Sequence, residues 1–138
     1  MSFDLSVLVT DRTNEDVINQ TQKGSYSASD LNRVGAAMNY VADRLKAQGY
    51  DTHINPKTDW AETDWPTSQS MAKYLADLAA LRAAITALSS TPQVPPDMDE
   101  LTYQEANDIE QILKDIDLLL TNAEAAWFYS GDLYAGEV

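Results

Sequence analysis

The 138-residue chain contains no cysteine and a single histidine, His53. Without cysteine it can form neither a disulfide framework nor a thiolate zinc or iron–sulfur site. One histidine cannot complete the common zinc ligand sets, and no Gly-x-Ser-x-Gly segment is present to offer it a serine nucleophile. We therefore expect no metal, no cofactor and no catalytic residue, and we interpret His53 as an ordinary loop residue.

Positive charge is also scarce. The chain has nine Lys and Arg against 22 Asp and Glu, and its net charge is −13. This composition argues against nucleic-acid binding, because affinity for the phosphate backbone comes mainly from clustered Lys and Arg side chains. The longest uncharged stretch, residues 83–96, contains three prolines and is too short to span a bilayer. The first residues lack the basic segment of a secretion signal. We expect no nucleic-acid partner, no membrane partner and no signal peptide.

The acidic residues are concentrated toward one end of the chain. Residues 97–138 contain eleven acids and one base, Lys114. Such a segment can keep a protein in solution, repel DNA or face a basic partner. The hydrophobic fraction of 44% is ordinary for a globular protein, and the length fits one core. We therefore expect a single domain over residues 1–138.

Apolar spacing predicts a short helix followed by three long ones. Apolar residues recur at alternating intervals of three and four, which places them on one helix face. The predicted ranges are 14–22, 28–48 (or 30–48), 68–88 and 103–128. Each range follows a residue suited to cap a helix: Thr13, Ser27 or Ser29, Thr67 and Thr102. The fold class is therefore mainly α, a small helical bundle.

The remaining segments are predicted to be connectors and arms. Residues 89–100 are rich in proline, and such a short, stiff link favours antiparallel packing of the third and fourth helices. Alternating apolar residues in 1–10 predict a short strand or a packed N-terminal arm. Gly131 and Gly136 are expected to end the last helix and leave 129–138 as an irregular C-terminal arm.

Aromatic residues outside the predicted helix cores are the candidate contact residues. Two tryptophans lie beside two aspartates in the loop 50–66, and further aromatics lie near the C-terminus. Loop tryptophans can stack on sugars, anchor a protein partner, or fold back as a lid over the bundle. The candidate partner or glycan contacts are Trp60, Trp65, Asp59, Asp64, Trp127, Tyr129 and Tyr134.

Several short segments together carry a family resemblance. They cover nearly the whole chain. In order they are Thr10-Asp11-Arg12-Thr13-x-x-Asp16-Val17, Asp30-Leu31-Asn32-Arg33-Val34-Gly35, Lys57-Thr58-Asp59-Trp60, Asp64-x-Pro66-Thr67, Leu101-Thr102-Tyr103-x-Glu105-Ala106-Asn107-Asp108-Ile109-Glu110 and Tyr129-Ser130-Gly131. In this order they resemble a group of small tail- or baseplate-associated structural proteins encoded by prophages of Gram-positive gut bacteria. None of the segments carries known chemistry.

The resemblance implies a virion context for the chain and no reaction. On this basis we expect a non-enzymatic structural or adaptor component of a phage tail, made in the bacterial cytoplasm and built into the virion. Its expected partners are other tail subunits, further copies of this chain among them. The alternative hypothesis is a carbohydrate-binding module that contacts a glycan of the host surface through the loop 50–66.

Overall fold

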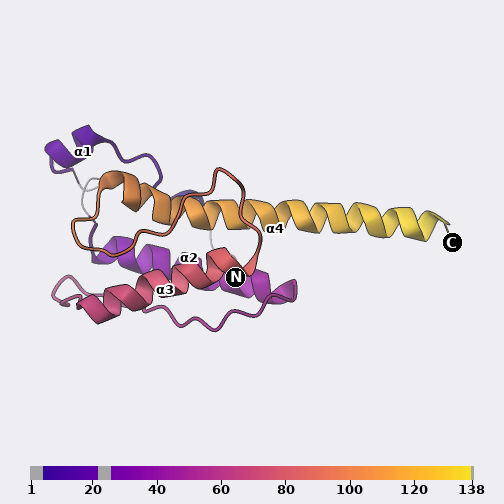
Figure 1. Ribbon diagram of the computed structural model, residues 1–138, viewed down its shortest axis with the longest axis horizontal. Coiled ribbons are helices and arrows are strands. Elements are labelled where there is room, and N and C mark those ends of the chain that lie inside the picture. The colour runs from indigo at the N-terminus through magenta and orange to yellow at the C-terminus, as the bar shows by residue number, and fades with distance from the viewer. Residues whose placement is uncertain (1–4, 22–25, 138) are drawn as a thin grey trace.

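The computed structural model of the protein describes residues 5–21 and 26–137, with side chains described as far as residue 126. In chain order the elements are a 3-10 turn η1 (Leu5–Val7) and the helices α1 (Asn14–Ile18), α2 (Ala28–Ala47), α3 (Ser68–Ala84) and α4 (Tyr103–Glu137). The predicted class, a mainly helical small bundle, is confirmed (Figure 1). No strand occurs in the described ranges.

The predicted helix starts are confirmed by their caps. The Thr13 and Thr67 hydroxyls accept hydrogen bonds from the backbone N–H groups of Asp16 and Ser70, at 3.2 and 3.0 Å. The Asp30 carboxylate accepts from the backbone N–H of Ser27 at 2.7 Å. At the start of α4, the Thr102 hydroxyl accepts from the Glu105 N–H at 3.0 Å. These side chains satisfy N–H groups that have no partner inside their helices.

All three long helices run in the same direction (Figure 1). Near its start α2 contacts the first turns of α4 through Arg33 and Glu110, and near its end Arg44 contacts Asp117 farther along α4. The expectation that α3 and α4 are antiparallel was therefore wrong. The connector 85–102 is long enough to return along the whole length of α3, because an extended chain advances roughly 3.3 Å per residue and a helix only about 1.5 Å.

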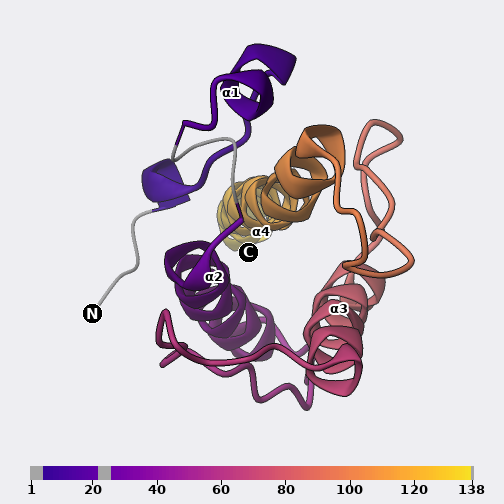
Figure 2. The same cartoon turned by 90° about the vertical axis from the view of Figure 1, so that its left-hand side faces the viewer.

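Each contact line between two long helices is covered by the segment that precedes one of them (Figure 2). The N-terminal segment bridges α4 and α2, where Arg12 binds both Glu110 and Asp30. The loop 48–67 bridges α2 and α3, because Trp60 bonds to Asn32 and the Asn55 carbonyl accepts from Lys73. The connector 85–102 bridges α3 and α4. These coverings explain how a parallel bundle closes without short turns.

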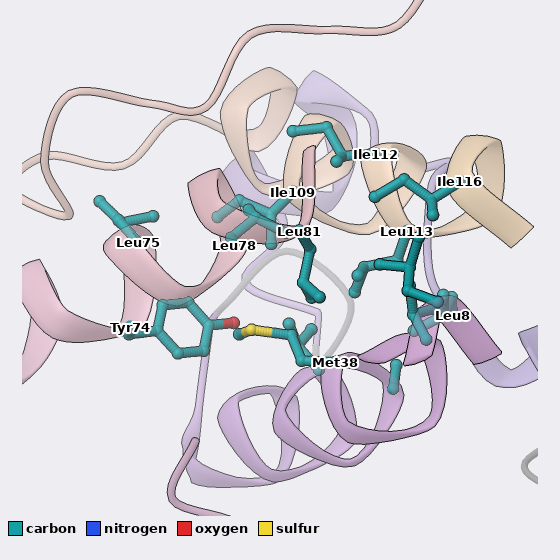
Figure 3. Close-up of a cluster of buried hydrophobic side chains, with 14 of the residues drawn as sticks. Leu8, Met38, Tyr74, Leu75, Leu78, Leu81, Ile109, Ile112, Leu113 and Ile116 are labelled. Atoms are coloured by element: carbon teal, nitrogen blue, oxygen red, sulfur yellow. The ribbon is translucent and has the colours of Figure 1, made fainter. Parts of the chain in front are cut away.

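The core lies between α2, α3 and α4, which all contact one another. Figure 3 shows side chains of this cluster from the three helices together with Leu8 of the N-terminal segment. Leu8 and Leu5 pack on this core, so the described part of the N-terminal region is a packed arm. The fully buried members with the largest side chains are Met38, Leu45, Leu78, Leu81, Ile109, Ile112, Leu113, Ile116 and Leu120.

Three predicted helix ends were wrong. α1 stops at Ile18, where Asn19 and Gln20 turn the chain and Gln20 adopts a φ of +53°. α3 stops at Ala84, because the backbone of Ile85 is extended. The Ile85 side chain still packs against the core. Two hydrogen bonds from Arg82, to the carbonyls of Thr91 and Pro92, hold the returning connector at this level.

The helix α4 continues to Glu137 rather than ending near residue 128, so the predicted irregular arm 129–138 was wrong as far as Glu137. An isolated glycine costs a helix roughly 1 kcal/mol and does not by itself end it. With 35 residues, α4 is about 52 Å long, against about 30 Å for α2. Among the described residues, none of the helices is both long and apolar enough to cross a membrane.

Candidate functional site

The loop 50–66, which carries four of the predicted contact residues, is fastened to α2 around Trp60. The Asn32 side chain accepts a hydrogen bond from the Trp60 N–H at 2.7 Å and donates one to the Trp60 carbonyl at 2.8 Å. At Gly35, an added Cβ would lie 2.7 Å from the Lys57 carbonyl oxygen, so only glycine lets the loop approach so closely. The Trp60 ring is half-buried against the core, with the Lys57 ammonium 5.2 Å from its centroid.

Trp65 lies in the opposite environment, with 88% of its surface exposed. The lid interpretation fits Trp60, which packs on the bundle, and does not fit Trp65.

The two aspartates of the loop are engaged locally. Asp59 accepts a hydrogen bond from Lys57 at 2.8 Å, and this bond lowers the pKa of the Asp59 carboxyl. Asp64 accepts from the backbone N–H of Ala61 at 2.8 Å, and its own N–H donates to the Ala61 carbonyl at 2.9 Å. Each carboxylate thus stabilises a turn of the loop. His53, in the same loop, is exposed, and its nearest acid is Asp51 at 3.7 Å.

The three C-terminal candidates, Trp127, Tyr129 and Tyr134, belong to the last turns of α4. Their side chains lie outside the described ones. The backbone at these positions is helical and projects beyond α2 and α3 (Figure 1). The structure therefore separates the predicted contact residues into a side loop and a projecting helix.

Among the described residues the most deeply buried charge, that of Glu110, belongs to an ion cluster that joins the N-terminal segment, α2 and α4. Glu110 is fully buried, and its carboxylate lies 2.6 Å from Arg12 Nη2 and 2.9 Å from Arg33 Nε. Asp30 lies 2.6 Å from Arg33 Nη2 and 3.4 Å from Arg12 Nη2. The backbone N–H of Val9 donates to the same Glu110 carboxylate at 2.9 Å. Arg12, Asp30 and Glu110 are buried and Arg33 is 19% exposed, so two positive and two negative side chains compensate one another in a mostly buried site.

Two further contacts surround this cluster. Arg12 lies over the ring of Tyr26, whose hydroxyl bonds to that of Tyr74, and burial raises the pKa of both phenols well above their usual range. Asn107 accepts from the Arg12 N–H and donates to the Arg12 carbonyl, both at 3.0 Å. Desolvation lowers the pKa of Arg33, but its hydrogen bonds to Glu110 and Asp30 outweigh that effect and leave the pKa raised.

Sequence reasoning missed this cluster, although one signal was present. Glu110 interrupts the apolar stripe of α4 between Ile109 and Ile112, and a charge on a core-facing stripe requires a buried partner. The segments that carry the family resemblance include Arg12, Asp30, Arg33 and Glu110, and also the Asn32 and Trp60 pair. In the structure these residues bind one another in two groups, which join α2 to the N-terminal segment and α4 and to the loop 50–66.

At the far end of the bundle a second arginine fixes the direction in which α4 leaves it. Arg44 of α2 forms ion pairs with Asp117 and with Glu124, the latter at 2.7 Å. Gln48 donates to the Leu120 carbonyl and to Glu124. Hydrogen bonds from Arg44 and Gln48 lower the pKa of Glu124. Beyond this latch, all residues from 121 to 126 are exposed.

No group of three or more His, Cys, Asp or Glu suited to hold a metal ion occurs among the described residues. No family model, curated protein or solved structure matches the chain.

Proposed function

We propose that this protein is a non-enzymatic structural or adaptor component of a phage tail or baseplate, and that it acts through protein–protein assembly in the virion. The observation that carries the proposal is the projecting half of α4. This helix is roughly 20 Å longer than α2, and its residues beyond the Arg44 latch are exposed as far as residue 126.

The chemistry of this helix supports an assembly role. From residue 127 the sequence contains Trp, Phe, Leu and two Tyr, residue types that are enriched at protein interfaces and costly to leave in water. The rigid bundle gives this arm a fixed base, because the buried ion cluster and the Arg44 latch both set the position of α4. A neighbouring subunit that covers the arm would bury aromatic surface without any change in the bundle.

The first test is mass spectrometry of purified phage particles induced from the source strain. We expect stoichiometric peptides from this chain in the particles. Absence from particles, with the protein abundant in the lysate, would overturn the virion assignment.

The second test separates the arm from the bundle. A variant that ends at residue 126 retains every core residue that the structure describes. We therefore expect the bundle to keep its helical circular dichroism and incorporation into particles to be lost. A control variant, Asp43→Asn, changes an exposed residue outside the arm and the latch and should be incorporated normally. Incorporation of the truncated chain at the full level would show that the arm is not the assembly surface.

The alternative, a glycan-binding module, has one observation in its favour, the exposed ring of Trp65. Host cell-wall polysaccharides should then quench the fluorescence of the wild-type protein and leave that of Trp65→Ala unchanged. A flat titration with several polysaccharides would count against glycan binding. Turbidity assays on host cell walls would test for hydrolysis, and we expect none.

A further inference from the structure

A groove crosses the end of the bundle at which the long helices begin, opposite the projecting end of α4. Its first lobe, about 350 Å³, lies between the start of α3 and the end of the connector 85–102. Its second lobe, about 340 Å³, lies between α1 and the start of α4. Tyr26 and Leu101 line both lobes, so the two are neighbours, and we call them together the end groove.

The floor of the first lobe is apolar and adaptable. Met71, Met98 and Leu101 line it and are only half-buried, although each also packs on the core. Methionine side chains are flexible and polarisable, and they are common on surfaces that accept varied apolar side chains. The walls are stiff by contrast, because Pro66 and Pro96 stand at the two sides. A flexible floor between rigid walls suits an apolar side chain inserted from outside.

The rim of the first lobe is negative and uncompensated. Asp97 and Asp99 are exposed on it, and the only hydrogen bond shown for them joins the Asp99 N–H to Asp97 Oδ1 at 3.0 Å. Among the described residues no cationic side chain lines this lobe, and neither carboxylate forms an ion pair. Glu100 follows directly in the chain and is also exposed. Carboxylates around an apolar floor favour a ligand that has cations beside an apolar group.

An exposed anchor stands next to the same lobe. Trp65 directly precedes Pro66 of the wall and is the most exposed large hydrophobic residue described. Tryptophan is enriched among the residues that dominate binding energy at interfaces, usually at sites ringed by polar groups. Within the chain, nothing that the structure describes covers it.

We propose that the end groove docks a basic segment of a partner protein, in which an apolar side chain enters the Met71–Met98 floor and flanking Lys or Arg side chains meet Asp97 and Asp99. Charge complementarity selects this occupant over a second copy of the chain. The projecting part of α4, beyond residue 121, contains three acids and no base, so its insertion beside Asp97 and Asp99 would place like charges together.

Docking at the end groove rests on the proposed assembly function, because it locates one partner of the assembly. The two are tested by separate experiments. A virion component whose end groove binds no peptide would refute the docking alone, and a peptide-binding protein that is absent from particles would refute the virion role alone.

The probe is a display library of random twelve-residue peptides, panned on the full-length protein. Peptides that also bind the double variant Asp97→Asn, Asp99→Asn are removed. The Asn substitutions keep the side-chain oxygen that accepts from the Asp99 N–H, so the local turn is preserved while two charges are lost. We expect a consensus with one apolar residue flanked by Lys or Arg. An acidic consensus, or no enrichment, overturns the proposal.

The consensus peptide is then labelled and its affinity measured by fluorescence anisotropy. We expect the double Asn variant to weaken binding about tenfold and to reduce its salt dependence. Met98→Gln, which keeps the length of the side chain, should weaken binding by a similar factor with little change in salt dependence. The matched control, Asp43→Asn with Asp51→Asn, removes the same charge from exposed positions outside the groove and should leave affinity unchanged.

Three results would contradict the assignment. Equal affinity for the wild type and the double Asn variant would show that the rim does not bind the peptide. Equal weakening by the control variant would show that only net charge matters. A consensus that matches residues 127–137 of this chain would identify a second copy, rather than a basic partner, as the occupant. Thermal melts of each variant verify that the fold is intact.

Discussion

At the end where the long helices begin, the Glu110 carboxylate is fully buried between Arg12 and Arg33, whereas at the other end Arg44 binds Asp117 and Glu124, whose carboxylates are partly exposed. Both sites pair arginine with carboxylates, yet their consequences for the fold differ. Breaking a buried pair leaves a charge in an apolar environment, while an exposed charge is solvated by water. The first site therefore holds the bundle together, and the second only directs α4.

The largest effect should follow from Glu110→Gln. The substitution keeps the shape of the side chain but leaves Arg12 and Arg33 with one carboxylate, Asp30, between them. We expect unfolding in urea to require about 3–5 kcal/mol less free energy than for the wild type. A loss below about 1 kcal/mol would show that water reaches the cluster, and the contrast between the two ends would then disappear.

A core substitution between the two ends should have a similar or slightly smaller effect. Ile116 of α4 is fully buried, and Ile116→Ala removes apolar contacts and leaves a cavity, at a cost of about 2–5 kcal/mol. Leu118, two residues along the same helix, is exposed and provides the control, since Leu118→Ala should change stability by no more than about 0.5 kcal/mol. Equal losses at both positions would mean that the assigned face of α4 is wrong.

The sequence predicted the helices well because their signals are local. Caps such as Thr67 act within four residues, and the apolar stripes have a fixed period, so the starts of α2, α3 and α4 followed directly. Direction in space has no such local signal. A stiff connector favours an antiparallel pair only if it turns at the end of a helix. Here Arg82 donates to the Pro92 carbonyl and Thr91 donates to Asp115 of α4, and these contacts between separate elements lead the connector back along α3.

The candidate site was predicted less well, for a related reason. Trp60 and Trp65 are five residues apart in similar Thr-Asp-Trp segments, and only the contact between Trp60 and Asn32 of α2 distinguishes them. Glu110 was hidden among many acidic residues that an acidic chain exposes by default. Its place inside an apolar stripe was the one feature that marked it as buried.

A small effect is expected at the far end of the bundle. Arg44→Gln removes the ion pairs to Asp117 and Glu124, and because these are partly exposed we expect a loss of about 0–1 kcal/mol. The pKa of Glu124 is lowered in the folded protein, so the stability from this pair is present above the pKa of an ordinary Glu. It is lost as the pH falls through the lowered value. Urea unfolding of both proteins across this range should show the difference shrinking toward acidic pH.

The smallest effect on folding should come from Trp65→Ala, and this variant extends the comparison from ion pairs to aromatic residues. Trp65 is almost fully exposed, so its loss should change stability by no more than about 0.5 kcal/mol. Trp60→Ala, the matched variant, removes a ring that packs on the core and should cost clearly more. If Trp65 is an anchor beside the end groove, Trp65→Ala should weaken peptide binding more than Trp60→Ala does. If Trp65→Ala changes neither stability nor peptide affinity, Trp65 has neither role, and the partner must dock on other surfaces.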